Sequence, residues 1–424
     1  MRSFDQFLKE KEMLLRPVYI YSIFFVFFSS PLYALSEVTV DCDSGDSIMT
    51  AIDSAVGPTQ ISVFGTCNQS LVINKNDISL LGNGDTVIDG ASFAPELDLI
   101  VIDGAVRVKV DGFNIQNGEI GLSAINGANI TISNTIFNTH SEFAIHASNN
   151  ASISTSNVNV VGTGSNGINV QAASILSVVD RLSVIGAGTF GLNLQDGSLL
   201  KADGADISFS RNLFGTQITI GSTAFVNDSS LAADSNVLAG LSVDSGSTFF
   251  AFSSHISASK NFLDGILCNT NSNIDIDASS TVKANNNGRH GINLEDTIFN
   301  VFSFFQLPGP VIEANDNAEH GVLLELGSKI DIGINSSLTS MGNGKTGLYA
   351  DDGSTVKLRD STIKDNQISM SDDEDDEHQD KNNADVSINF GSRISFDFDN
   401  NDIGIARCDR SSISRGAVRC LGRD

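Results

Sequence analysis

Three carboxylates recur at matching positions in the later part of the sequence. Glu295, Glu325 and Asp351 each lie four residues after a glycine that opens a short apolar run. If those runs stack as neighbouring strands, the carboxylates lie about 5 Å apart. At that separation they can raise one another's pKa, share a cation such as Ca²⁺, or act as the paired acids of a retaining glycosidase. We therefore take all three as candidate catalytic residues.

Other polar and aromatic side chains accompany the carboxylates on the same repeats. The two histidines directly precede the glycines, and the tyrosine follows the last glycine by two residues. Such groups can donate to, accept from or stack on a sugar. The candidate ligand-binding residues are Arg289, His290, Asn293, His320 and Tyr349.

A repeat must position these residues. The motif is a glycine, an aliphatic residue, a variable residue and another small or aliphatic residue, as in GLSA at Gly121, GINV at Gly167, GLNL at Gly191, GLSV at Gly240, GINL at Gly291, GVLL at Gly321 and GLYA at Gly347. Asp98, Ala144, Gly215 and Gly265 fill the gaps, so that the spacing is 23 to 30 residues. A further column is asparagine: Asn212, Asn236, Asn261, Asn287, Asn317 and Asn343.

Short alternating runs lie between these punctuating residues, as in Ile292/Leu294 and Ile330/Ile332. Period-two runs separated by turn residues predict strands. A unit of about 24 residues with three short strands cannot bury its own apolar face, so units must stack. The sequence therefore predicts an all-β, single-stranded parallel β-helix of about 13 coils. Leucine-rich repeats and propeller blades fit the frame and the period less well.

The beginning of this region predicts a capping helix. Asp46 can cap a helix whose apolar residues Ile48, Met49, Ile52 and Val56 share one face. The segment SIMTAIDSAVGPTQISVFGTCNQSLVINKNDISLLGNGDTVIDG, residues 47–90, resembles the opening of the pectate-lyase-like superfamily. With the repeats, the resemblance covers about residues 40–405. It implies a right-handed parallel β-helix with a groove along the first strand of each coil, but no particular activity.

The enzyme motifs of that superfamily are missing from this sequence. The polygalacturonase-type set is not present: Asp351-Asp352 occurs alone, and His290-Gly291 and His320-Gly321 lack the preceding glycine. The Asp-Pro-His-Asp motif of alginate epimerases is absent as well. Solvation of an exposed parallel sheet explains outward acids without any function. We therefore favour a binding or structural role over catalysis.

One repeat is interrupted beside the candidate site. The 30-residue spacing contains an insertion, FSFFQLPGP, at Phe302–Pro310. Inserted loops of solenoids often carry function. The sequence leaves two possibilities open: the loop walls a cleft over Glu295 and Glu325, or it packs flat and leaves a featureless surface. A polysaccharide lyase or glycoside hydrolase on the coils of residues 289–351 is the alternative function.

The first 34 residues predict export. An 11-residue apolar run follows basic residues and precedes the small residue Ala34, the order of a cleaved signal peptide. Five cysteines in an exported chain indicate two disulfides and one leftover thiol. We expect one bridge to link Cys42 with Cys67 and the other Cys408 with Cys420. Cys268 falls at an inward position of a repeat, where we expect it to be buried.

Charge and composition restrict the classes of partner that this chain can bind. The net charge of −26 excludes a typical nucleic-acid binder, and the absence of tryptophan leaves few aromatic residues for sugars. The run SDDEDDEHQD at residues 371–380 is typical of a solvated loop, with weak Ca²⁺ binding as the alternative. No cofactor is required.

The resulting domain prediction is a signal peptide (1–34), an N-terminal cap (35–60), a β-helix (61–405) with an acidic insertion (370–383), and a C-terminal cap or tail (406–424). We predict a monomer that is secreted, periplasmic or on the cell surface, with no membrane contact after cleavage. Its expected partner is a polysaccharide or a cell-surface glycan.

Overall fold

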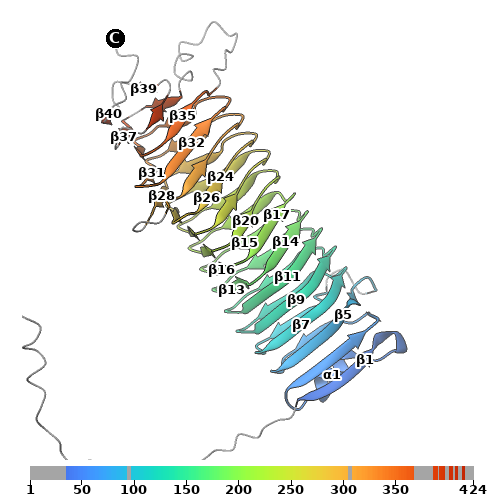
Figure 1. Ribbon diagram of the computed structural model, residues 1–424. Coiled ribbons are helices and arrows are strands. Elements are labelled where there is room, and N and C mark those ends of the chain that lie inside the picture. The colour runs from blue at the N-terminus through green and yellow to red at the C-terminus, as the bar shows by residue number, and fades with distance from the viewer. Residues whose placement is uncertain are drawn as a thin grey trace, which may run out of the picture. The chain divides into compact units, whose positions relative to one another are not determined.

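The computed structural model describes residues 35–92, 97–303, 308–366, 385–389, 391–396, 401–403, 406–408 and 413–415. The described chain is a parallel β-solenoid of about 13 turns, which confirms the predicted fold class. Figure 1 shows the strands stacked one coil above the next, from α1 and β1 at the blue end to β35 and β37 at the red end. The predicted acidic insertion lies outside the described residues.

Two parallel sheets form the walls of the described solenoid. We call the 14-stranded one sheet B. Its strands are β4 (Leu71–Ile73), β6 (Ile100–Asp103), β8 (Ile120–Ile125), β10 (Phe143–Ala147), β12 (Ile168–Val170), β15 (Phe190–Leu194), β18 (Phe214–Ile218), β21 (Ala239–Val243), β24 (Asp264–Asn269), β27 (Ile292–Glu295), β30 (Val322–Glu325), β33 (Leu348–Ala350), β36 (Val386–Ile388) and β39 (Ala406–Cys408).

Sheet A, with 26 strands in the described part, supplies two strand segments to most coils. Its early strands are β1 (Ser36–Asp41), β2 (Thr59–Phe64), β3 (Thr66–Cys67), β5 (Ile78–Asp89), β7 (Val108–Gln116), β9 (Asn129–Asn138) and β11 (Ser152–Val161). The first segments of later coils are β13 (Ile175–Val178), β16 (Leu199–Asp203), β19 (Thr223–Asn227), β22 (Thr248–Phe252), β25 (Asn273–Asp277), β28 (Ile298–Phe302), β31 (Lys329–Ile332), β34 (Thr355–Leu358), β37 (Arg393–Phe396) and β40 (Ile413–Arg415). The second segments are β14 (Arg181–Ile185), β17 (Asp206–Ser210), β20 (Ser230–Ala232), β23 (His255–Ser257), β26 (Thr281–Lys283), β29 (Val311–Glu313), β32 (Ser337–Met341), β35 (Thr362–Lys364) and β38 (Asp402–Ile403).

Sheet A turns a corner within each coil. β11 pairs with β13 through Ser152–Thr155 and with β14 through Val158–Val161, so that one long strand continues as two shorter ones. Asn134 and Asn157 occupy the corner with φ values of 49° and 54°, a left-handed conformation that asparagine tolerates well. The predicted three strands per coil are thus the sheet B strand and the two segments of sheet A.

The glycine and asparagine columns are two halves of one contact. In the coil of Asn287, its Oδ1 accepts hydrogen bonds from the backbone N–H of Asn261 at 2.9 Å and from Asn261 Nδ2 at 3.2 Å. A Cβ placed on Gly265 would lie 2.6 Å from Asn287 Nδ2 and 2.5 Å from the Gly291 carbonyl oxygen. Only glycine leaves room for the amide of the next coil, which explains why the two residue types recur together.

Register corrects one member of the glycine column. Ile100 pairs with Leu122, so Leu99 aligns with Gly121 and Asp98 lies one residue earlier. Elsewhere the predicted column holds; Phe143 pairs with Ile120 and Ile145 with Leu122, which places Ala144 beside Gly121.

The N-terminal helix is present but differs in detail from the prediction. The residues of α1 are Ile48–Ser54, after a short 3₁₀ turn, η2 (Cys42–Ser44). Its N-cap is Ser47 and not Asp46, because the Ser47 side chain accepts from the Thr50 N–H. Ile48 and Ile52 are buried in the core, whereas Val56 lies beyond the helix and is exposed.

Strand pairing reaches into both predicted end regions. Within the predicted N-terminal cap, β1 pairs with β2 and so belongs to sheet A. At the other end, β39 pairs with β36 and β40 with β37, so strand pairing extends beyond residue 405 to Arg415.

Candidate functional site

The predicted carboxylate column is present on sheet B. Glu295 on β27 is the register partner of Glu325 on β30. Asp351 directly follows β33, and its N–H donates to the Leu324 carbonyl, which places it on the next coil. Neighbouring coils are about 4.8 Å apart, so the three carboxylates lie in one row along the sheet edge.

The electrostatics of this row single out its middle member. Burial raises the pKa of Glu325, and the charges of Glu295 and Asp351 raise it further. Asp351 also accepts a hydrogen bond from the Tyr349 hydroxyl at 3.0 Å. Asn293 Nδ2 donates to Glu295 at 3.3 Å, while Asn293 Oδ1 is buried without a hydrogen-bond partner. A raised pKa favours the protonated form of Glu325, which is the form that a general acid needs.

The two histidines form a buried stack before the strands. His290 and His320 are 5% and 8% exposed, and their ring centroids lie 5.3 Å apart. The His320 ring continues to Tyr349 at 5.0 Å. Desolvation lowers the pKa of His290 to about 4 and of His320 to about 3, so both rings are neutral at pH 7. Buried neutral rings fit a packing role at least as well as the predicted role in ligand binding.

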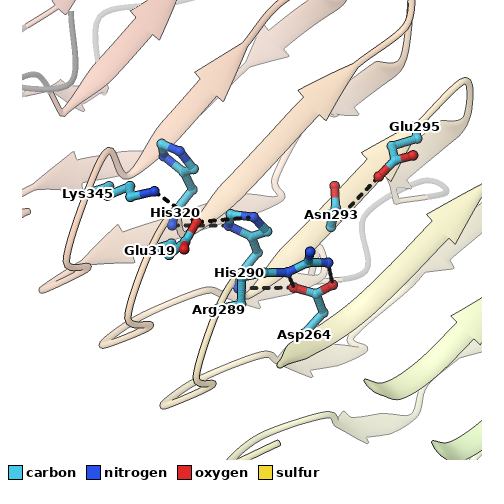
Figure 2. Close-up of polar contacts among 8 residues, drawn as sticks. All are labelled: Asp264, Arg289, His290, Asn293, Glu295, Glu319, His320 and Lys345. Atoms are coloured by element: carbon cyan, nitrogen blue, oxygen red, sulfur yellow. Dashed lines mark hydrogen bonds and ion pairs between the residues drawn. The ribbon is translucent and has the colours of Figure 1, made fainter. Parts of the chain in front are cut away.

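Arg289 takes part in an ion-pair row beside the histidines. Its guanidinium donates to both carboxylate oxygens of buried Asp264, which also accepts from the His290 N–H at 3.1 Å. Glu319 lies 3.0 Å from Lys345 Nζ and 3.6 Å from His290 Nε2. Figure 2 shows this row running from Asp264 to Lys345, with Glu295 and Asn293 apart from it. The positive charge of Arg289 is therefore already neutralised.

The described residues of the inserted segment lie beside sheet A. Its first residue, Phe302, ends β28 on sheet A, and Pro308 accepts hydrogen bonds from Ser279, between two sheet A strands. Residues 304–307 lie outside the described part. The described residues of the insertion thus flank sheet A and do not wall a cleft over Glu295 and Glu325, which lie on sheet B.

A second surface on sheet A was missed by the sequence analysis. A cavity of about 190 Å³ is lined by Phe225, Val226, Asn227, Phe250, Ala251, Phe252, Asp275, Asp277 and Phe302. We call its four phenylalanines, with Asn227 and Asp275, the aromatic surface. The Phe225 and Phe250 rings stack in parallel, 4.9 Å between centroids and 5° between planes.

The phenylalanines of this surface face outward. Phe225 and Phe252 are 45% and 41% exposed. The signal was available in the sequence: Ala224, Val226, Phe249 and Ala251 take the inward positions, which leaves phenylalanine at outward ones. A count of tyrosine and tryptophan alone does not detect this aromatic surface.

The cysteine predictions have separate outcomes. Cys42 and Cys67 form a disulfide with 5.1 Å between their Cα atoms, as predicted. Cys268 is a free, buried thiol, and burial raises its pKa to about 12, so it is unreactive. The Cys408–Cys420 pairing lies outside the described residues, since neither side chain is described.

Two features of the described residues bear on possible partners. No helix there has the length and apolar character that a membrane crossing requires. No group of three or more histidine, cysteine, aspartate or glutamate side chains in that part of the chain is arranged to hold a metal ion. Ca²⁺ binding stays a prediction.

Several solved structures resemble the solenoid. The A-module of the Azotobacter vinelandii mannuronan C-5 epimerase AlgE6 matches at 11% identity and TM-score 0.35, covering 86% of this chain and 83% of that one. A polygalacturonase from Erwinia carotovora matches at 10% identity and TM-score 0.36, covering 92% and 97%. Vag8 in complex with C1 inhibitor matches at 14% identity and TM-score 0.40, covering 91% and 99%.

The parallel β-solenoid that the resemblance implied is confirmed by the strand pairing of the described residues. Likenesses at these identities and TM-scores say nothing about what the chain binds or catalyses. No protein-family model matches the sequence, and neither does any curated protein.

Proposed function

We propose that the protein is an exported glycan-binding solenoid that holds a neutral sugar on the aromatic surface. The observation that carries this proposal is the parallel Phe225–Phe250 pair in a cavity that also presents Asn227 and Asp275. A sugar ring has apolar C–H faces and hydroxyl edges, so it fits an aromatic wall flanked by carboxylate and amide groups.

The polar rim supports a neutral ligand. Asp275 accepts hydrogen bonds from Asn273 at 2.6 Å and from Asn300 at 2.9 Å, which fix its carboxylate in place. Each oxygen keeps a lone pair that a sugar hydroxyl can use. An acidic rim in a chain of net charge −26 would repel a negatively charged glycan at this point.

Export is part of the proposal. The Cys42–Cys67 disulfide indicates an oxidising compartment. The predicted signal segment of residues 1–34 supports release to the periplasm, the cell surface or the medium.

Binding of neutral oligosaccharides to a double variant tests the proposal. We expect Phe225→Ala with Phe250→Ala to weaken binding at least about tenfold. Each aromatic ring that becomes buried when a sugar binds contributes about 1.5–3 kcal/mol. Phe262→Ala, which removes an exposed ring outside the cavity, is the matched control. Isothermal titration over a panel of glycans would measure both. Equal affinity in the double variant and the control would refute the proposal.

Catalysis on sheet B is the second candidate. The observation in its favour is the raised pKa of Glu325 beside Glu295. Carboxylates about 5 Å apart suit a retaining glycosidase, with Glu325 as acid and Glu295 as nucleophile. In the same proposal Asp351, Arg289, His290, Asn293, His320 and Tyr349 position the sugar. Glu295→Gln and Glu325→Gln should abolish any hydrolysis seen for wild type across neutral and acidic polysaccharides; equal activity would exclude this site.

A further inference from the structure

A second cavity on sheet A has the opposite charge to the rest of the molecule. It measures about 350 Å³ and lies on three successive strands, β31, β34 and β37. Its lining residues are Lys329, Thr355, Val356, Lys357, Arg393, Ile394 and Ser395. Three cations and two hydroxyl groups converge here, although the whole chain has 25 lysines and arginines against 51 aspartates and glutamates.

The strand register explains how five residues from three successive coils come together. Lys329, Thr355 and Arg393 form one outward column, and Lys357 and Ser395 form the next. The backbone position after Ser395 in that second column is Arg415 on β40. Stacking at about 4.8 Å per coil therefore gathers the cations within the reach of a single small group.

The described residues that line the cavity include three cations and no acid. Asp331, which is outside this lining, lies 3.5 Å from Lys329 Nζ and 3.7 Å from Lys357 Nζ. Arg393 adds a guanidinium with donors in a fixed fork, the geometry that binds oxyanions best. The cavity thus has a net positive charge among its described lining residues.

We propose that this cavity is a binding site for a phosphate or sulfate monoester group carried by the ligand. Three cations and the hydroxyls of Thr355 and Ser395 approach from two columns, which suits a group with three terminal oxygens better than the two oxygens of a carboxylate. The site is independent of the aromatic surface. Phe250 and Lys357 share one outward column at a distance of four coils, about 19 Å.

Titration of small probes tests the inference. The probes are inorganic phosphate, inorganic sulfate, acetate, a sugar phosphate, a sugar sulfate and the uncharged parent sugar, each measured by isothermal titration. We expect both ester-bearing sugars to bind, and acetate and the parent sugar to bind at least tenfold more weakly. Lys329→Gln with Arg393→Gln should weaken ester binding at least tenfold, whereas Phe225→Ala with Phe250→Ala should leave it unchanged.

The pH dependence separates the two esters. A phosphate monoester gains its second charge above about pH 6, whereas a sulfate ester keeps one charge throughout. Affinity that rises between pH 5 and 7.5 for the sugar phosphate, with little change for the sugar sulfate, would identify phosphate as the preferred group. Higher affinity for the sulfate at both pH values would identify sulfate. Both results support the inference.

A charge-matched control excludes a general effect of net charge. Lys109→Gln with Lys283→Gln removes two cations outside the cavity, each already paired with a carboxylate. Equal weakening in this control would overturn the proposal, as would tight binding of acetate. Binding that appears only after the acids of Asp372–Glu377 are replaced by amides would overturn it in favour of the chain's own acidic segment as the occupant. The Phe225/Phe250 variant tests the sugar site and the Lys329/Arg393 variant tests the ester site. A negative result for one site therefore leaves the proposal for the other site standing.

Discussion

At the scale of single residues, the histidines of sheet B behave as packed, neutral rings. Desolvation holds the pKa of His290 and His320 far below 6.5, and it lowers the pKa of His140 to about 4 as well. His290 also faces Asp264, Glu319, Arg289 and Lys345, whose opposing charges partly cancel at the ring. Protonation of these histidines therefore lowers the stability of the fold, whether or not a ligand is bound.

This burial predicts how stability depends on pH. Because the folded-state pKa values lie below 6.5, the unfolded chain binds more protons between about pH 4 and 6.5, and stability falls as the pH falls through that window. Asp98 acts in the opposite direction, since burial raises its pKa to about 6, and its contribution is lost as the pH rises from about 4 to 6. We expect urea midpoints to drop from pH 7 to 4.5, and His320→Gln to show a smaller drop than wild type. An unchanged drop in that variant would contradict the burial argument.

At the scale of the element, the asparagine ladder fixes one coil upon the next. Asn287 accepts two hydrogen bonds from Asn261 and donates to Asn317 Oδ1 at 3.0 Å, all in the interior. Asn287→Ala leaves buried donors unsatisfied, and each costs about 1–3 kcal/mol. We expect a loss of at least about 2 kcal/mol in chemical unfolding. Asn300→Ala removes one half-buried bond to Asp275, so the same measurement should show about 1 kcal/mol or less.

The elements also show how far the sequence alone leads. Strand positions, the coil period, the carboxylate row and the buried Cys268 were predictable, because inward and outward residues alternate with period two. The sequence placed the insertion at residues 302–310 but not the sheet that it flanks, since a coil corner and a strand end look alike in sequence. The partners of Arg289 were hidden for a related reason: Asp264 is 25 residues earlier and adjacent only after stacking. The aromatic surface and the cationic cavity likewise require three or four coils in register.

At the scale of the whole molecule, the strand pairs in the described part of the chain join each coil to its neighbours. Stability in such a solenoid is approximately a sum of nearest-neighbour terms. A defect at Asn287 should therefore increase amide hydrogen exchange in residues 240–320 and leave residues 60–140 close to wild type. Exchange measured by mass spectrometry would show this. A uniform loss of protection along the chain would instead mean that the solenoid unfolds as one cooperative unit.

The charge of the whole molecule is also unevenly divided. Sheet B carries an acidic row near its C-terminal end, whereas sheet A carries the cationic cavity at a similar height. The net charge of −26 therefore describes neither face. A glycan that carries both a neutral sugar ring and an ester group would therefore bind on sheet A.

The paired glycine and asparagine columns limit how many residues could be removed from this chain without disturbing the stack of coils. Excision of residues 215–239 would remove one coil, including Asn236, and would bring Gly240 to the place of Gly215. Asn212 would then meet Asn261 in the same geometry. Excision of residues 215–226 alone would put Asn227 at the place of Gly215, which now leaves space for the asparagine amide of the next coil. Excision of a whole coil therefore keeps each glycine opposite an asparagine, whereas excision of half a coil does not.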